Sequence, residues 1–172
     1  QFDSYSYRLN VNPNKNFAFQ FSQGFIKSPE ALEPETDIVR TTASMIHTKQ
    51  LMHEKFISTS FVWGMNSSEE DKLNSFLVES NLKLKPVSIF IRYEFVQKDA
   101  HELQLPESFD HSAFNINAFT LGLNKVFLKR LKTDLSLGIQ GTINFTDDDL
   151  KSIYGKNPMA GEVYLRIAPS AM

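Results

Sequence analysis

Hydrophobic and polar residues alternate along most of this chain with a period of two. Between positions 135 and 145 the odd positions hold Leu, Leu, Ile, Gly, Ile and Phe, and the even positions hold Ser, Gly, Gln, Thr and Asn. Side chains of a β-strand point alternately to opposite faces, so this pattern predicts a strand with one apolar and one polar face. The same split recurs at 17–22, 57–65, 87–95 and 162–167, with weaker copies at 5–11, 38–47, 74–84 and 119–127. The chain is therefore predicted to be all-β, with nine strands.

The predicted strands are long. Many extend over about nine to eleven residues, which is the length that crosses a bilayer at a tilt, whereas strands of globular proteins average nearer about five or six. All seven prolines are predicted to fall between or after strands, because proline cannot donate to a β-ladder. Single helical turns are possible at 67–73 and 147–153. We expect one domain over 1–172.

The composition excludes several classes of protein. In 172 residues, 18 Lys and Arg stand against 20 Asp and Glu, a net charge of −2 that does not favour a nucleic-acid binder. The absence of Cys removes disulfides and thiolate chemistry. No apolar run approaches the roughly 18 residues of a membrane-spanning helix. The aromatic content, with 15 Phe and 5 Tyr, is high and calls for an explanation.

Two features indicate that the apolar face points outwards. The polar face is rich in Ser, Gly, Asn, Gln and Thr, whereas a water-exposed sheet face would carry more Lys and Glu. The apolar face is aromatic towards many strand ends, as in the aromatic girdles of membrane barrels. The predicted girdle consists of Tyr5, Phe17, Phe61, Trp63, Tyr93, Phe95, Phe127 and Phe145.

The connections between the predicted strands alternate in length. Long connections are predicted at 24–36, 97–112 and 146–160, and short ones at 12–15, 85–86 and 130–132. The connection at 66–72 is moderate, and that at 47–55 is an exception of middling length. Outer-membrane barrels have short turns on the periplasmic side and longer loops on the outer side. The alternation therefore favours a transmembrane antiparallel β-barrel.

Charged residues share the polar phase of their strands. Turning this face to lipid would cost roughly 2–4 kcal/mol for each Arg near the midplane, so the arginines are predicted to point into a lumen, where the glutamates could pair with them. The predicted lumen-facing set is Arg8, Arg40, Glu79, Arg92, Glu94, Glu162 and Arg166. Lys125 has the outward phase and lies near the short-turn side, where a lysine can reach the headgroups.

A barrel of nine strands would be incomplete, because bacterial single-chain barrels have an even number of strands. One explanation is that the strands are miscounted at the first one, whose alternation is weak. The interpretation that we favour is that the chain is the C-terminal part of a larger barrel.

Several segments carry a resemblance. They are Lys-Ser-Pro-Glu-Ala-Leu-Glu-Pro at 27–34, Arg-Thr-Thr-Ala-Ser at 40–44, Phe-Val-Trp-Gly at 61–64, Arg-Tyr-Glu-Phe-Val-Gln-Lys-Asp at 92–99, Tyr-Gly-Lys-Asn-Pro at 154–158 and Leu-Arg-Ile at 165–167. Together they resemble the C-terminal portion of a little-characterised family of Gram-negative outer-membrane β-barrel, porin-like proteins. The resemblance implies an outer-membrane location and a longer full length. The ending Pro-Ser-Ala-Met departs from the terminal aromatic of many such proteins.

Nothing in the sequence favours catalysis or a cofactor. No nucleophile elbow, zinc-protease motif or phosphate loop is present, so we expect no enzyme. A metal site could be sought at Asp99, His101, Glu102, Asp110 and His111, or at 147–149, but the spacings match no metal motif, and solvated loops are the preferred interpretation.

The predicted function is passive passage of small hydrophilic solutes, with Arg8, Arg40, Arg92 and Arg166 favouring anions. The first alternative is a structural or partner-binding barrel, in which the charged set forms an ion-pair network that plugs the lumen and the long loops recruit a protein. The second is a soluble, lipocalin-like barrel with an apolar ligand inside. The expected partner in the first two cases is the lipid bilayer of the outer membrane.

Overall fold

A computed structural model of the chain describes residues 3–28, 36–69, 71–106, 109, 113–130 and 132–169. Within these residues the chain forms a single antiparallel sheet of nine strands in sequential order. The strands are β1 (Tyr5–Asn14), β2 (Phe17–Ile26), β3 (Ile38–Met52), β4 (Lys55–Ser67), β5 (Lys72–Lys83), β6 (Val87–Lys98), β7 (Phe114–Arg130), β8 (Thr133–Thr146) and β9 (Met159–Pro169). Before β9 come a 3-10 turn, η2 (Asp148–Leu150), and a one-turn helix, α1 (Lys151–Tyr154). The all-β prediction and its nine strands are confirmed.

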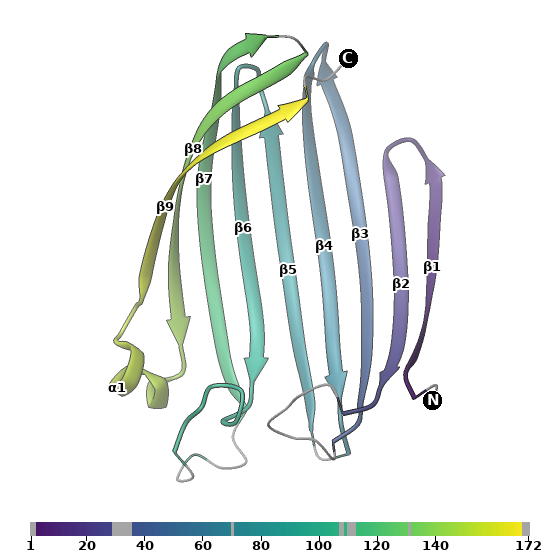
Figure 1. The fold of residues 1–172 in the computed structure, drawn as a ribbon, viewed down its shortest axis with the longest axis vertical. Helices are drawn as coiled ribbons and strands as arrows, with labels where there is room; N and C mark the ends of the chain where they lie inside the picture. Colours follow the sequence, from purple (N-terminus) through teal and green to yellow (C-terminus); the bar gives the residue numbers. More distant parts are fainter. Residues whose placement is uncertain are drawn as a thin grey trace.

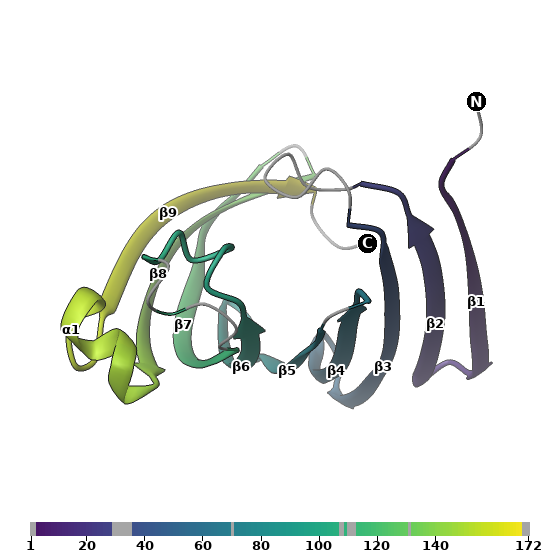
Figure 2. The same cartoon turned by 90° about the horizontal axis from the view of Figure 1, so that it is seen from below.

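The sheet curls into an arc, with β1 at one edge and β9 at the other (Figures 1 and 2). Each strand pairs with its neighbours in sequence, and within the described residues no pairing joins β1 to β9. The sheet is therefore open, and the transmembrane barrel, which the sequence led us to expect only in part within this chain, stays a prediction.

Connections of different length lie at opposite ends of the sheet (Figure 1). One end, the short-turn end, holds the tight turns after β1, β3, β5 and β7, and the other, the long-loop end, holds the connections after β2, β4, β6 and β8. The expected exception at 47–55 was wrong, because β3 continues to Met52 and only His53 and Glu54 form the turn. A helical turn at 67–73 was also wrong where the structure describes it, since β4 runs to Ser67 and β5 starts at Lys72.

Two prolines contradict the expectation that all prolines lie outside strands. Pro13 is within β1, between Val11 and Asn14, where the register with β2 shifts. A bulge at the end of an edge strand tolerates proline because no ladder hydrogen bond is lost there. Pro169, the last residue of β9, occupies a similar edge position.

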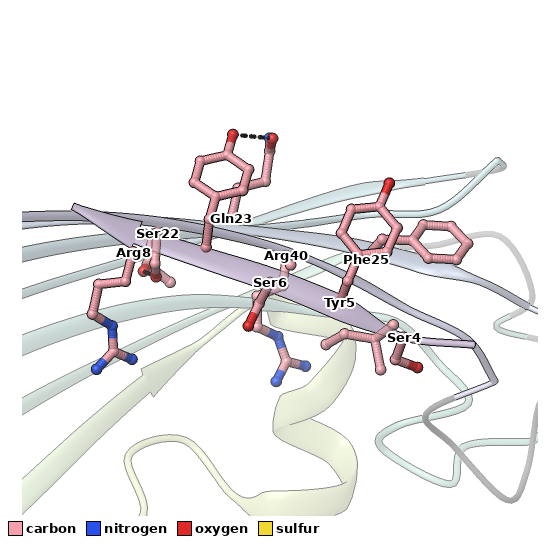
Figure 3. Close-up of a pocket in the computed structure, with 12 residues that line it drawn as sticks. Ser4, Tyr5, Ser6, Arg8, Ser22, Gln23, Phe25 and Arg40 are labelled. Carbon is pink, nitrogen blue, oxygen red and sulfur yellow. Dashed lines mark hydrogen bonds between the residues drawn. The ribbon is translucent and has the colours of Figure 1, made fainter. Parts of the chain in front are cut away.

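The two faces of the sheet differ in chemistry. We call the face towards the centre of the arc the inner face and the opposite face the outer face. Arg8 and Arg40 point to the inner side in Figure 3, and the registers extend this phase across all nine strands. The outer face carries large exposed apolar side chains, as Leu121 (52%), Ile139 (57%) and Leu165 (61%) illustrate.

Small polar residues of the inner face are the buried ones in β7 and β8. Thr120 and Ser136 are 5% and 4% exposed, and Asn124 is also buried. Rings from neighbouring strands cover the adjacent glycines, since a Cβ added to Gly122 would meet Phe90 and one added to Gly138 would meet Tyr164. In β7 and β8 the sheet is thus close-packed on its inner face and open on its apolar outer face.

Candidate functional site

All seven charged residues predicted to share one face do lie on the inner face. They come from β1 (Arg8), β3 (Arg40), β5 (Glu79), β6 (Arg92 and Glu94) and β9 (Glu162 and Arg166). Their distribution over the arc is uneven. The middle of the sheet brings charges of both signs together, whereas the β1–β3 region holds arginine alone.

Arg92 is neutralised by two neighbours. It lies directly opposite Glu79 in the β5–β6 register, and its Nε donates a hydrogen bond of 2.7 Å to Glu79 Oε2. Its Nη1 also lies 3.9 Å from a carboxylate oxygen of Glu94. The three side chains are partly exposed, so this group contributes little to stability. Its effect is on the charge of the inner face, because the two glutamates compensate the positive charge of Arg92.

The two charged residues of β9 are not paired with each other. Glu162 accepts a hydrogen bond of 2.8 Å from Gln140 Nε2 on β8. Arg166 lies opposite Ser136 and is exposed. Among the described residues, no acidic side chain forms an ion pair with it. The expected pairing of arginines with glutamates therefore holds for Arg92 but not here.

Arg8 and Arg40 line a hollow together with hydroxyl-bearing side chains (Figure 3). Arg8 is opposite Ser22 in the register and Arg40 is opposite Gly24, so the two arginines stand on alternate strands with a small residue between them. Strand spacings place their Cα atoms roughly 12 Å apart. Arg40 donates through Nε to Asn66 Oδ1 at 2.9 Å, and no other described side chain bonds its two terminal nitrogens.

No carboxylate is among the residues that line this hollow. Ser4, Ser6 and Ser22 line it, and the Ser22 and Thr42 hydroxyls lie 2.7 Å apart. Guanidinium groups bind carboxylate and phosphate oxygens through their planar forks, and hydroxyl groups can donate alongside them. The arrangement is chemically suited to small anions.

The predicted girdle residues all lie on the outer face and divide between the two ends. Phe17 begins β2 and Phe127 lies late in β7, both near the short turns, whereas Tyr5 begins β1 at the long-loop end. Phe61 is near the middle of β4. The remaining members, Trp63, Tyr93, Phe95 and Phe145, lie in the parts of their strands nearer the long loops.

Polar partners accompany the rings near the long loops, and sequence reasoning missed them. Trp63 Nε1 donates to Asn74 Oδ1 at 3.2 Å, and the Tyr93 hydroxyl donates to Asn117 Oδ1 at 2.6 Å. In β1 the Tyr7 hydroxyl donates to Gln23 Oε1 at 2.7 Å. The sequence does contain a signal for these hydrogen bonds: near the strand ends, amide residues replace apolar ones at positions that face outwards. Each ring therefore has an apolar body and a satisfied polar tip.

A dry cluster at the long-loop end was also missed. Its buried members are Ala100, Phe114 and Leu150, and Leu103, Leu105, Phe109 and Ile116 pack against them. The connection after β6 and the turn η2 thus share one small core. Ile116 belongs to the inner phase, because it pairs with Val96 of β6 and Thr146 of β8. The cluster joins the two connections to the inner face at this end of the sheet.

The loop acids considered as metal ligands have partners in the chain. Asp99 accepts the backbone N–H of Glu102, and Glu102 pairs with Lys98 at 2.9 Å. Asp110 and His111 lie outside the described residues. Where the structure is described, no group of three or more His, Cys, Asp or Glu is placed to hold a metal ion.

The acidic run at 147–149 is divided between different partners. Asp147 accepts hydrogen bonds from the backbone N–H and side-chain amide of Asn115, at 2.7 and 3.3 Å. Asp148 pairs with Lys151, whose hydrogen bond holds the pKa of the Asp148 carboxyl below its usual value. The run thus ties its loop to the start of β7 through Asp147 and holds its own turn through Asp148.

No family model, curated protein or solved structure matches this chain. No helix among the described residues combines the length and hydrophobicity needed to cross a membrane. Inference about function therefore starts from the chemistry of the two faces of the sheet.

Proposed function

We propose that this chain forms part of the wall of a transmembrane β-barrel in a bacterial outer membrane, and that the barrel lets small hydrophilic solutes pass by diffusion. The observation that carries this proposal is the exposure of the apolar outer face over the whole sheet, opposite an inner face that holds the arginines and glutamates. Soluble proteins rarely expose continuous apolar surfaces of this extent. A lipid environment would remove that surface from water.

Strand length and the asymmetry of the connections support the same proposal. The strands extend from 10 residues in β1 to 17 in β7, long enough to cross a hydrocarbon layer that needs about nine to eleven. The tight turns lie at one end and the longer connections at the other (Figure 1). This is the arrangement of outer-membrane barrels, with the short turns on the periplasmic side.

The two edge strands of the sheet, β1 and β9, indicate how many further strands a closed barrel would need. Unpaired backbone groups at β1 and β9 would be costly inside a bilayer, so a membrane barrel has to pair both edges. Both strands run from the long-loop end to the short-turn end (Figure 1). An odd number of further strands between them would close the barrel with antiparallel pairing throughout and give an even total. This supports the idea that the chain is part of a larger barrel.

The inner face favours anions as solutes. The sequence assigned this preference to four arginines, but Arg92 is compensated by Glu79 and Glu94. Arg8 and Arg40 carry the preference in the proposal, with Arg166 nearer the short turns. Side-chain charges that line a pore select ions in this way.

Conductance in planar bilayers tests the proposal with the full-length protein. We expect steady ohmic steps and a reversal potential that indicates anion preference in a salt gradient. The double variant Arg8→Gln with Arg40→Gln should shift the reversal potential towards cations. Lys49→Gln, which removes an exposed charge from the outer face, is the matched control and should leave it unchanged. Absence of conductance steps would contradict a pore.

One observation favours the plugged, partner-binding alternative. The dry cluster around Leu150 ties two connections to the inner face, where the mouth of a barrel would be. If the barrel inserts without conducting, a closed mouth with loops that present a binding surface is the better interpretation. The soluble, lipocalin-like alternative needs an apolar interior. The inner face does hold apolar side chains, among them Val62, Leu77 and Phe90, but the arginines and glutamates beside them are unsuited to an apolar ligand.

A further inference from the structure

Opposite ends of the sheet carry opposite charge. Among the described residues, the long-loop end is rich in acids, including Asp71, Asp99 and the run at 147–149. At the short-turn end, nine Lys and Arg residues stand against Glu54 and Asp134. We call these nine the basic rim: Lys15, Lys49, Lys55, Lys83, Lys85, Lys125, Lys129, Arg130 and Lys132. Such a separation within a chain of nearly zero net charge indicates a surface for an anionic partner.

The inward part of the basic rim is largely compensated. Glu54 forms an ion pair with Lys85, and this hydrogen bond raises the pKa of the Lys85 ammonium group. Asp134 lies opposite Lys129 in the β7–β8 register. The Lys83 ammonium group lies 5.6 Å from the centre of the Phe56 ring. These cations have partners in the chain.

The outward part of the rim is not compensated. Lys49, Lys125 and Arg130 are exposed and share the phase of the apolar outer face, since Lys49 pairs with Ile57, Lys125 with Leu137 and Arg130 with Thr133. Where the structure is described, none of the three forms an ion pair with an acidic side chain. Their charges are therefore available to an external anion.

Exposed apolar side chains lie beside these cations. In β7 the register shifts between Val126 and Leu128, so Phe127 and Leu128 together face Leu135 of β8. Phe127 is 56% exposed and Leu128 is 49% exposed. Cations beside large apolar side chains are characteristic of protein surfaces at a membrane interface. There the cations contact the lipid headgroups and the apolar side chains enter the acyl layer.

A hollow on the outer face lies directly beside Lys125. It has a volume of about 580 Å³ and is lined by Leu123, Phe127, Leu137, Ile139 and Val163 in addition to Lys125 and Gly138. Its size falls within the range of about 300–1,000 Å³ for ligand pockets. Apart from the Lys125 ammonium group, its side chains are hydrocarbon. An apolar chain with one negative group at its end matches this lining.

We propose that Lys125 and Arg130 bind the phosphate of an anionic phospholipid, with one acyl chain of that lipid in the hollow between β7, β8 and β9. The proposal rests on the proposed placement of the outer face in a membrane. A lipid with net negative charge is favoured over a zwitterionic one, because neither cation forms an ion pair among the described residues and Asp134, the acid beside Thr133, has the inner-face phase. Lys49 extends the same surface to the β3–β4 turn.

Lipid binding by the full-length protein in neutral detergent micelles tests the proposal. Phosphatidylglycerol and phosphatidylcholine with identical chains are titrated in parallel, and retained lipid is counted by native mass spectrometry. Each cation near an anionic lipid surface changes binding severalfold, so we expect a preference for phosphatidylglycerol on the order of tenfold. Lys125→Gln with Arg130→Gln should remove most of this preference.

A matched variant controls for the loss of charge itself. Lys72→Gln with Lys156→Gln removes two exposed charges from the long-loop end and should keep the preference. Phosphatidylglycerol with short chains should bind more weakly than the long-chain lipid, because it fills less of the hollow. An equal preference for phosphatidylglycerol in the rim variant and the wild type would overturn the proposal.

The test separates this proposal from the proposed barrel. Insertion is measured independently, as protection from protease in phosphatidylcholine vesicles. If the protein inserts but the rim variant keeps its lipid preference, the barrel stands and the lipid site is wrong. If the protein does not insert in any vesicle but loses its lipid preference in the rim variant, the lipid site stands and the barrel is wrong.

Discussion

At the long-loop end, side chains from two separate connections keep water out, whereas near the middle of β6–β9 aromatic rings that lie over glycines of adjacent strands do so. The first region relies on Leu150 and Phe114, which are far apart in the sequence and almost fully buried. The second relies on cross-strand pairs, such as Phe90 opposite Gly122 and Tyr164 opposite Gly138. The first kind of packing needs tertiary structure outside the sheet, and the second follows directly from strand register.

This difference indicates how easily each of the two packed regions can lose its structure. A cross-strand pair is fixed once the register is fixed, because the side chains that face each other are then determined. A loop cluster depends on two connections adopting one conformation, so a single truncation there can loosen both. The long-loop end is therefore the part of the molecule where structure can be lost without loss of the sheet.

Truncation of the loop cluster should have the largest effect. Leu150 has 0% exposure, so Leu150→Ala leaves a cavity and should lower the free energy of unfolding by about 2–5 kcal/mol. Limited proteolysis should show faster cleavage in both connections, with the strands still protected. Ile153→Ala, at a site that is 47% exposed, is the control and should change little. Equal effects of the two variants would show that the cluster does not hold the connections.

A methyl group at Gly122 should break the other kind of packing. In Gly122→Ala the new Cβ would lie 2.1 Å from Phe90 Cε1, so the ring has to move, and overpacking of this kind costs about 1–3 kcal/mol. Gly141→Ala is the matched control on β8, because no atom lies within 4 Å of its added Cβ. Equilibrium denaturation of both variants measures the difference. A Gly122→Ala protein as stable as Gly141→Ala would mean that the ring is not packed against the glycine.

The strands could be predicted from sequence because their periodicity is local. Alternation alone predicts all nine strands and assigns Arg8, Arg92 and Glu162 to one face. The ends of strands were less accurate. At the end of β3, Thr48, Lys49 and Gln50 are all polar, so the alternation stops before the strand does.

Contacts between distant segments have no comparable pattern in the sequence. Ala100, Phe114 and Leu150 are separated by long stretches of irregular sequence, so nothing in their spacing indicates a shared core. The inner-face charges share one face, as the alternation predicts, but their pairing depends on which residues the register brings opposite each other. Arg92 meets Glu79 through the register of β5 and β6, whereas Arg8 has Ser22 opposite.

Loss of one acceptor at the long-loop end should have a smaller effect than truncation of the cluster. Asp147 accepts hydrogen bonds from both the backbone and the side chain of Asn115. Asp147→Ala leaves these donors without that acceptor in a partly buried site and should cost about 1 kcal/mol. Asp147→Asn keeps one carbonyl oxygen and should retain most of the stability. Hydrogen exchange at the Asn115 amide gives a local readout, and unchanged protection in Asp147→Ala would contradict the assignment.

The ion pair between the β3–β4 and β5–β6 turns should give the smallest effect, visible only in the pH dependence of stability. The hydrogen bond with Lys85 holds the pKa of the Glu54 carboxyl below its ordinary value and raises the pKa of the Lys85 ammonium group. Stabilisation by Glu54 is therefore present above its unfolded pKa and is lost as the pH falls through the lowered, folded value. Stabilisation by Lys85 is present below its unfolded pKa and is lost as the pH rises through the raised, folded value.

Melting temperatures of the wild type, Glu54→Gln and Asp148→Asn from pH ~8 down to pH ~3 compare the two ends directly. Each variant lacks one carboxyl with a lowered pKa, so each should lose part of the wild type's acid-dependent destabilisation. Glu54→Gln should lose the greater part, because Glu54 joins two turns that are distant in the sequence, whereas Asp148 pairs with Lys151 within one turn. Both effects should shrink in high salt, since exposed charges are screened. A constant difference between Glu54→Gln and the wild type across this pH range would show that the pair between the turns does not stabilise the short-turn end.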